Sequence, residues 1–224
     1  MIDTLNQYDH ELMLWMNYDG GWWQDPFWYF VTNIPTWIPL YVVIVVVLMR
    51  EAYRHKKWAQ ALLVVVFTAL IITAADRFTS GLIKPWAARL RPSHQEGVME
   101  YLHYLGDYRG GQFGFCSSHA ANSFALCTWV SLLFRQRHLT CAMVLFALLN
   151  CYSRIYAGVH YPGDILVGSI IGILCGWLGH VGYKKASNYY KIPMCGQHTA
   201  IPITLTFWLT MLIISIVAFF FVLQ

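Results

Sequence analysis

Three ionisable residues lie within one short segment, between two apolar stretches of the chain. The segment Ser153–Asp164 reads Ser-Arg-Ile-Tyr-Ala-Gly-Val-His-Tyr-Pro-Gly-Asp, and it offers a cation (Arg154), an imidazole (His160) and a carboxylate (Asp164). Charged groups at a membrane are costly, so their presence at this position indicates function. Pro162 predicts a helix start that places Asp164 in the first turn, where it can hold one ring nitrogen of His160. An imidazole oriented in this way is a better nucleophile.

Two further parts of the chain supply groups that bind anions. Lys84 and Arg91 stand before prolines where another apolar element ends, and Ser117, Ser118 and His119 open a third element. Backbone N–H groups at a helix start are unpaired donors and form a ready anion site. The arginine fork suits phosphate oxygens, and lysine acts as a point charge. The pattern predicts a phosphate site in which His119 can protonate a leaving oxygen.

The composition is that of a membrane protein. The 224 residues, a length compatible with one domain, are 58% hydrophobic and 12% charged, whereas soluble domains carry about 25% charged residues. The basic residues are scattered through short loops, which excludes nucleic acid as a partner. The six cysteines include no CxxC and no Cys/His spacing typical of metal ligands, so we interpret them as apolar packing residues and predict no metal.

Six apolar stretches are each interpreted as a membrane span; they cover residues 27–49, 58–75, 119–134, 139–152, 165–183 and 200–223. The second is expected to run on as a helix, because Asp76, Ser80 and Lys84 recur every four residues and share one helical face. In the first, Pro35 and Pro39 are expected to kink or split the span. The predicted fold is all-α, a polytopic bundle of about six transmembrane helices.

An amphipathic helix is predicted at the N-terminus. Its apolar face consists of Leu5, Tyr8, Leu12, Trp15 and Met16. Such a helix lies in the membrane interface or packs on the protein's own flank, and the pattern leaves both open. We expect Asp25-Pro26 to begin the next helix. The chain therefore divides into an interfacial segment (1–25), a core (26–183) and a C-terminal loop with an additional helix (184–224).

The loop charges predict an orientation. Lysine and arginine are dense on one side, at Arg50, Arg54, Lys56, Lys57, Arg135, Arg137, Lys184, Lys185 and Lys191. The positive-inside rule makes that side cytoplasmic. The loops 84–119 and 153–164 are then extracytoplasmic. The stretch 93–115 is the longest loop of the chain, and loops of that length are typically functional or mobile.

The three polar segments resemble the signature of the type 2 phosphatidic acid phosphatase (PAP2) superfamily. Its first part, Lys-x6-Arg-Pro, is matched by Lys84-Pro-Trp-Ala-Ala-Arg-Leu-Arg91-Pro92, and its third part by Ser153-Arg154 with His160 and Asp164. The middle part, Pro-Ser-Gly-His in the family, reads Cys116-Ser117-Ser118-His119 here. This departure affects the turn before the third span and retains its serine and histidine. The resemblance covers about residues 26 to 183.

The resemblance implies a role for each site residue. His160 attacks phosphorus and forms a phosphohistidine, Asp164 orients His160, and His119 protonates the leaving group and then activates water. The phosphate oxygens are held by Lys84, Arg91, Arg154, Ser117 and the Ser118 amide. No metal and no cofactor is needed, because the cations stabilise the charge of the transferred phosphoryl group.

The family membership that we infer implies a bacterial lipid phosphatase. The interfacial N-terminal helix resembles undecaprenyl-diphosphate phosphatases, which makes undecaprenyl diphosphate the expected substrate. The stretch Phe-Cys-Ser-Ser-His-Ala-Ala-Asn-Ser-Phe, starting at Phe115, resembles a subgroup that includes lipid A phosphatases; phosphatidylglycerophosphate and phosphatidic acid are further alternatives. We expect a multi-pass protein of the bacterial inner membrane with its active site facing the periplasm. A phosphorylated lipid is its expected partner, without an obligate protein partner.

Two other classes fit less well. Vanadium-dependent haloperoxidases share the family's site but are soluble. A non-catalytic lipid-binding or transport protein would not need two histidines together with Asp164. Outside the signature, Asp76 is open to an ion-pair or a catalytic role. We expect Arg89, Asp107, Tyr108 and Arg109 mainly to solvate the long loop.

Overall fold

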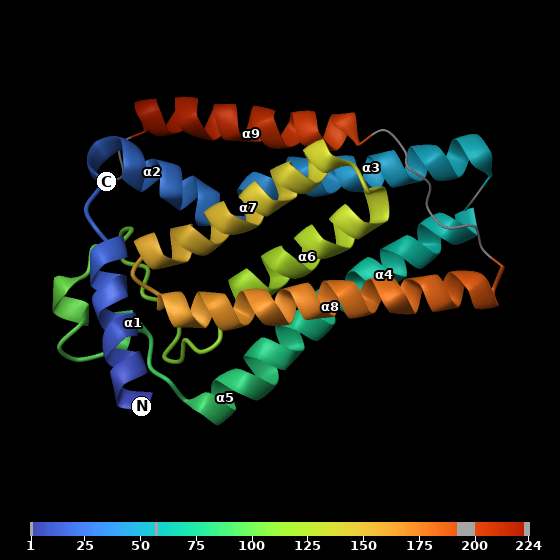
Figure 1. The fold of residues 1–224 in the computed structure, drawn as a ribbon. Coiled ribbons are helices and arrows are strands. Elements are labelled where there is room, and N and C mark those ends of the chain that lie inside the picture. Colours follow the sequence, from blue (N-terminus) through green and yellow to red (C-terminus); the bar gives the residue numbers. More distant parts are fainter. Residues whose placement is uncertain (1, 57, 192–199, 222–224) are drawn as a thin grey trace.

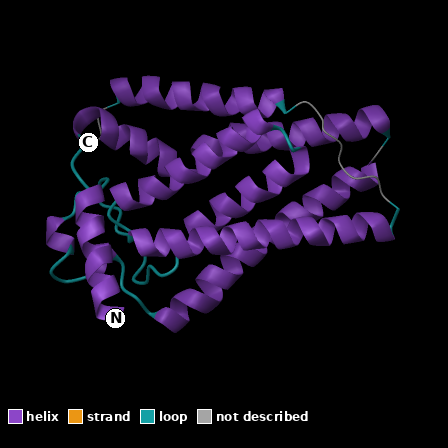
Figure 2. Ribbon diagram, viewed as in Figure 1, coloured by secondary structure: helices purple, strands orange, loops and turns teal. Residues whose placement is uncertain are grey.

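The computed structural model describes residues 2–56, 58–191 and 200–221. Within these ranges the chain is helical without a named strand (Figure 1; Figure 2). Its elements are α1 (Ile2–Met16), α2 (Gly21–Thr32), η1 (Ile34–Trp37), α3 (Ile38–His55), α4 (Trp58–Asp76), η2 (Arg77–Ile83), α5 (Lys84–Ala87), η3 (Pro92–His94), η4 (Met99–Tyr101), α6 (Ser118–Phe134), α7 (Arg137–Tyr156), α8 (Pro162–Tyr189) and α9 (Ile201–Phe220). The all-α prediction is confirmed. Residues 192–199 and 222–224 of the predicted C-terminal region lie outside the described residues.

The long apolar helices make the protein a multi-pass membrane protein. Among the described residues, four helical stretches are long and apolar enough to cross a bilayer: Trp58–Ala87, α7, α8 and α9. The bent pair formed by α2 and α3 supplies a fifth. The remaining predicted span is α6, whose 17 residues are at the short end of the range for a span. Figure 1 shows α6 inside the bundle, among α4, α7 and α8.

The first predicted span is bent where its prolines occur. The chain turns by 72° between Gly21–Thr32 and Ile34–Arg50, with Pro35 in the first turn of η1. Pro39 lies near the start of α3, where its missing N–H costs no helical bond. The expected helix start at Asp25-Pro26 is wrong, because α2 begins at Gly21 and contains Pro26. The carboxylate of Asp25, the residue before this proline, accepts hydrogen bonds from His103 and Tyr156.

The second predicted span continues into the site as expected. After α4 the chain forms a π-helical segment, η2, in which the Lys84 N–H donates to the Thr79 carbonyl five residues back. Such π segments are frequent at functional sites. Asp76, Ser80 and Lys84 all line one cavity, so the predicted common face is present.

Small residues bring α6 and α8 into close contact. A side-chain carbon at Gly168 would lie 2.4 Å from the Ser117 carbonyl oxygen, and one at Gly172 would lie 2.2 Å from that of Ala121. Close approach of this kind is how membrane helices gain packing energy without a hydrophobic driving force. The two helices start side by side, and the Ser117 N–H donates to the Asp164 carbonyl at 3.0 Å. The glycines therefore set the distance between the two helix starts that carry His119 and Asp164.

A substitution at the tightest of these glycines tests this packing. Gly172→Ala places a methyl group against backbone that cannot move independently, so we expect about 1–3 kcal/mol of destabilisation and a clearly lower Tm in detergent. Gly81→Ala is the control, because no atom lies within 4 Å of its added carbon. Equal melting temperatures for the two variants would contradict the assigned role of Gly172.

Candidate active site

His160 and Asp164 form a buried pair between α7 and α8. Pro162 starts α8 as predicted, and the Asp164 carboxylate reaches back over this start. Its Oδ2 lies 3.3 Å from Nδ1 of His160 and accepts the Tyr161 N–H at 3.1 Å. The side chains of His160 and Asp164 are 1% and 0% exposed. On its other side the ring faces Arg91, whose Nη1 lies 3.1 Å from Nε2. Since a guanidinium only donates, this network assigns the Nδ1–H tautomer, with the Nε2 lone pair toward the cations.

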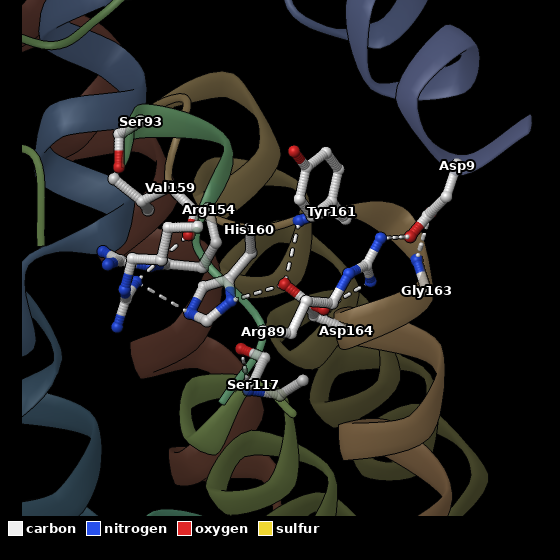
Figure 3. A network of polar contacts seen from close by, with 12 residues as sticks. Asp9, Arg89, Ser93, Ser117, Arg154, Val159, His160, Tyr161, Gly163 and Asp164 are labelled. Atoms are coloured by element: carbon white, nitrogen blue, oxygen red, sulfur yellow. Dashed lines mark hydrogen bonds and ion pairs between the residues drawn. The ribbon is translucent and has the colours of Figure 1, made fainter. Parts of the chain in front are cut away.

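The second carboxylate oxygen of Asp164 is held by Arg89. Arg89 Nη1 donates to Oδ1 of Asp164 at 2.9 Å, and its Nη2 donates to Oδ2 of Asp9 at 2.7 Å. Asp9 also accepts the Gly163 N–H at 2.7 Å through Oδ1. Figure 3 shows this chain of contacts, which runs from His160 through Asp164 and Arg89 to α1. Asp164 is therefore fixed from three sides.

The long loop folds back onto the first signature segment and places its arginines. Arg91 N–H donates to the Gln112 carbonyl at 3.0 Å, and Gly114 N–H donates to the Arg89 carbonyl at 2.9 Å. Between them Leu90 and Phe113 form an isolated antiparallel bridge. Position 114 has no room for a residue larger than glycine, because an added side-chain carbon would lie 2.9 Å from Oδ2 of Asp164. The loop is thus a structural part of the site.

Arg154 approaches from the last turn of α7 and has only neutral partners among the contacts found. Its Nη1 donates to Thr32 at 2.7 Å and its Nη2 to the Tyr108 hydroxyl at 3.1 Å. Arg91 and Arg154 are 7% and 3% exposed. The Nε atom of each is buried and has no hydrogen-bond partner in the described part of the chain. Buried donors without partners are costly, which favours an anion here.

A cavity of about 600 Å³ brings most of the predicted residues together. Lys84, Arg91, Ser118, His119 and Arg154 line one end of it. His160 and Asp164 do not line it and lie behind Arg91. The Ser118 hydroxyl is 2.7 Å from that of Ser80 on η2. The start of α6, the end of α7 and the end of the second span therefore meet around this cavity, while the start of α8 lies behind Arg91.

Ser117 departs from the predicted arrangement. It is fully buried, and its Oγ caps α6 by accepting the Ala120 N–H at 3.4 Å. Its own N–H is not a free donor, because it is bonded to the Asp164 carbonyl. Ser117 thus joins the two helix starts, and Ser118 is the serine that faces the cavity.

Three residues that were not predicted as site residues contact the site. Arg89 and Tyr108, expected to solvate the loop, contact Asp164 and Arg154 respectively. Asp9 reaches the site from α1. The position of Arg89 inside the first signature segment is a signal that could have identified it; Asp9 carries no such signal. Arg109 does stabilise the loop, through the Gly106 carbonyl and its stacking on Tyr104.

Electrostatics favour a neutral His160 and an anionic ligand. Burial, followed by the charges of Arg91, Arg154 and Lys84, holds the pKa of His160 well below its usual value. Burial and the neighbouring Arg154 also lower the pKa of Arg91. Both effects reflect burial first and concentrated positive charge second. A phosphate bound among these cations would relieve the repulsion; His119 lines the cavity, and Nε2 of His160 lies behind Arg91.

The fold and the site together define a membrane-embedded hydrolase of phosphate esters. Residues 60–188 match the model of the PAP2 superfamily. The chain belongs to this superfamily and is a multi-pass membrane phosphatase.

Curated relatives agree with this class. The chain is 42% identical over 183 residues to a lipid A 4'-phosphatase of Bacteroides thetaiotaomicron, covering 80% of this chain and 78% of the relative. It is 30% identical to a lipid A 4'-phosphatase of Porphyromonas gingivalis, covering 87% and 76%. An undecaprenyl-diphosphatase of Bacillus subtilis matches at 38% identity over 64 residues, 29% of this chain and 32% of the relative. The crystal structure of a transmembrane PAP2-type phosphatidylglycerolphosphate phosphatase from Bacillus subtilis shares the fold, with a TM-score of 0.62 at 19% identity, covering 81% and 87%.

The lowered pKa of His160 predicts its charge over a wide pH range. Because the neutral form is favoured, the His160 ring should stay neutral when the pH is lowered through 6.5. Its single N–H proton should remain on Nδ1. Histidine-selective ¹⁵N NMR of the ligand-free protein in micelles measures this directly, with His160→Ala assigning the signals. An imidazolium at this position above pH 6 would contradict the prediction.

Proposed function

We propose that the protein hydrolyses the 4'-phosphate of lipid A. The observation that carries the proposal is the identity to two lipid A 4'-phosphatases over at least three quarters of each relative. The undecaprenyl diphosphate expected from the N-terminal helix has weaker support, because the relative of that name matches over only 64 residues. The site geometry fits removal of one phosphoryl group from a lipid at the membrane surface.

In the proposed mechanism His160 Nε2 attacks phosphorus in line with the leaving oxygen. The new N–P bond forms as the P–O bond to the sugar breaks, and His119 donates a proton to that oxygen. Asp164 keeps the Nδ1–H tautomer and stabilises the charge that develops on the ring. In the second step His119 takes a proton from water, which attacks the phosphohistidine and releases inorganic phosphate.

Arg91 lies against the nucleophile of this mechanism. Its Nη1 is 3.1 Å from Nε2 of His160 and donates to the Val159 carbonyl oxygen, also at 3.1 Å. A phosphate oxygen is a stronger, charged acceptor, and Arg91 would transfer its hydrogen bond to it. The nucleophile is then exposed by the substrate itself. Lys84, Arg154 and the α6 start with Ser118 would bind the remaining oxygens.

The residues that line the cavity form three layers. Along each lining helix a basic residue comes first, then polar side chains, and then an apolar residue. On α7 Arg154 is followed one turn down by Asn150 and then by Phe146; on α6 His119 is followed by Asn122 and Leu126. On the second span Lys84 is followed by Ser80, Asp76 and Ile72. With a rise of 1.5 Å per residue, a layer is about 6 Å deep.

The middle layer favours a sugar next to the phosphate. Asp76 accepts a hydrogen bond from Asn122 at 3.5 Å, and Ser80, Ser123 and Asn150 line the same region. Hydroxyl and amide groups of an acylated sugar can bond to these side chains, and acyl chains fit the apolar layer. A diphosphate would instead leave an anionic group facing Asp76. At about 6 Å and an effective dielectric of 20, that repulsion is about 3 kcal/mol.

We further propose the bacterial inner membrane as the location, with the site on the periplasmic side. The support is the excess of lysine and arginine in the loops at the opposite ends of the spans. Phosphorylated lipid is the only partner that this function requires.

Phosphate release by the purified protein in detergent tests the function. The panel is 4'-phosphorylated lipid A, undecaprenyl diphosphate, phosphatidylglycerophosphate and phosphatidic acid. We expect a preference of at least tenfold for lipid A, no effect of EDTA, and no turnover by His160→Ala. A preference for undecaprenyl diphosphate would overturn the substrate, inhibition by EDTA would overturn the metal-free mechanism, and an active His160→Ala would overturn the nucleophile.

Asp76→Asn tests the middle layer separately. Removing the carboxylate should raise the ratio of undecaprenyl diphosphate to lipid A turnover about a hundredfold, because a repulsion of about 3 kcal/mol is lost and a sugar contact is weakened. Asp107→Asn is the matched control, since it removes one carboxylate from an exposed loop position away from the cavity lining. An equal ratio in both variants would rule out selection by Asp76.

A further inference from the structure

Helix α1 has three distinct faces. Leu5, Tyr8, Leu12 and Trp15 follow one another at intervals of three, four and three residues. They form a stripe of exposed apolar side chains, 63%, 64%, 43% and 77% exposed respectively. A second face is polar and exposed, with Gln7 donating to Glu11 at 3.1 Å. The third face, with Asp9, His10 and the fully buried Met13, is turned to the protein.

The protein-facing side of α1 contacts the catalytic segment directly. Asp9 receives hydrogen bonds from Arg89 and from the N–H of Gly163, the residue before Asp164. The Arg89 guanidinium lies 4.2 Å from the centre of the Tyr161 ring. The His10 ring stacks on the same Tyr161 ring, with ring centres 4.9 Å apart. Figure 3 shows Asp9 coming from a separate helix to meet Arg89 and Gly163. The helix therefore touches the residues on both sides of Pro162, at the start of α8.

The end of α1 is fixed as well. Asn17, which follows the last residue of α1, donates to the carbonyl oxygens of Ile155 and Tyr156 at 3.0 and 2.8 Å. Its own Oδ1 accepts the His103 N–H at 2.7 Å. Asn17 is buried. Because α1 is held at its middle and just after its C-terminal end, a displacement of α1 is transmitted to the segment between α7 and α8.

The direction of α1 identifies what covers its apolar stripe. Figure 1 shows α1 running across the direction of α8 and α9, at the end of the bundle where α8 begins. A helix that crosses the ends of membrane spans, with one apolar and one polar exposed face, lies at the boundary between lipid and water. The apolar stripe of α1 therefore contacts the surface of the bilayer in which the spans are embedded.

We propose that α1 is a positioning element of the active site that couples the bilayer surface to the catalytic carboxylate. The bilayer holds the apolar stripe, Asp9 holds Arg89, and Arg89 holds Asp164 in the orientation that His160 needs. Asp9 and Arg89 are positioning residues, because they act through Asp164 and do not touch the phosphate. The inference rests on the proposed roles of His160 and Asp164.

The first arm of the test removes the carboxylate of Asp9. Asp9→Asn has the same shape but places an amide against the Arg89 guanidinium. We expect kcat to fall about tenfold, while KM and the inhibition constant of inorganic phosphate change less than twofold, because the phosphate-binding cations are untouched. Glu11→Gln is the matched control, with the same charge change on the same helix and no contact to Arg89.

A second variant reaches the same contact without changing a charge. In Gly163→Ala the added carbon would lie 2.7 Å from Oδ2 of Asp9, so the variant displaces the carboxylate. We expect the same loss of kcat with an unchanged phosphate inhibition constant. If Asp9→Asn behaves as Glu11→Gln does, or if Gly163→Ala retains full kcat, the positioning role is refuted.

The second arm tests the coupling to lipid with the protein reconstituted in phospholipid vesicles. The double substitution Leu12→Ser/Trp15→Ser should lower kcat about fivefold in the wild-type protein. In the Asp9→Asn variant it should lower kcat less than twofold, because both changes act through the contact between Asp9 and Arg89. Tyr189→Ser, which removes an exposed aromatic residue at the other end of α8, is the control. Additive losses, or no loss, would refute the coupling. Absence of phosphatase activity in the wild-type protein would instead refute the proposed function.

Discussion

The site depends on three cations, the buried Arg91 and Arg154 and the partly buried Lys84, for which the described part of the chain shows no ion pair. Lys84, Arg91 and Arg154 share one end of a cavity, and the carboxylate nearest to them, Asp164, is already bonded to Arg89 and His160. Removing charge from water costs several kcal/mol per ion unless it is paired. The fold accepts this cost because helix packing and the loop that folds back onto Arg89 and Arg91 hold the arginines in place. In the proposed function, affinity for phosphate would follow from relief of the repulsion between these cations.

The rest of the bundle supplies fixed distances between these groups. Each cation is on a different element, so their spacing is determined by how the helices pack and not by sequence distance. The glycines of α8 set the approach to α6, and the bond from the Ser117 N–H to the Asp164 carbonyl joins the two helix starts. A shift of α8 by one ångström would move His160 relative to His119, which is the kind of displacement to which in-line transfer is most sensitive.

Local rules predicted the parts of the site that depend on short spacing. The four-residue interval from His160 to Asp164, the helix start at Pro162 and the common face of Asp76, Ser80 and Lys84 are all present. The contact between Asp9 and Arg89 joins residues 80 positions apart, and no local pattern encodes it. The local rule that places proline in the first helical turn gives the wrong start for α2, which begins at Gly21, five residues before Pro26.

In the proposed function, the layered cavity separates catalysis from selection. Attack on phosphorus would require only the cationic end and the two histidines, and these groups would treat any phosphate ester alike. The groups that differ between lipids would lie farther from the phosphorus, so selection would fall to the layer formed by Asp76, Asn122 and Asn150. A carboxylate in that layer can discriminate by charge without touching the reacting atoms. Because it is two helical turns from Lys84, it can change during evolution without disturbing the phosphate site.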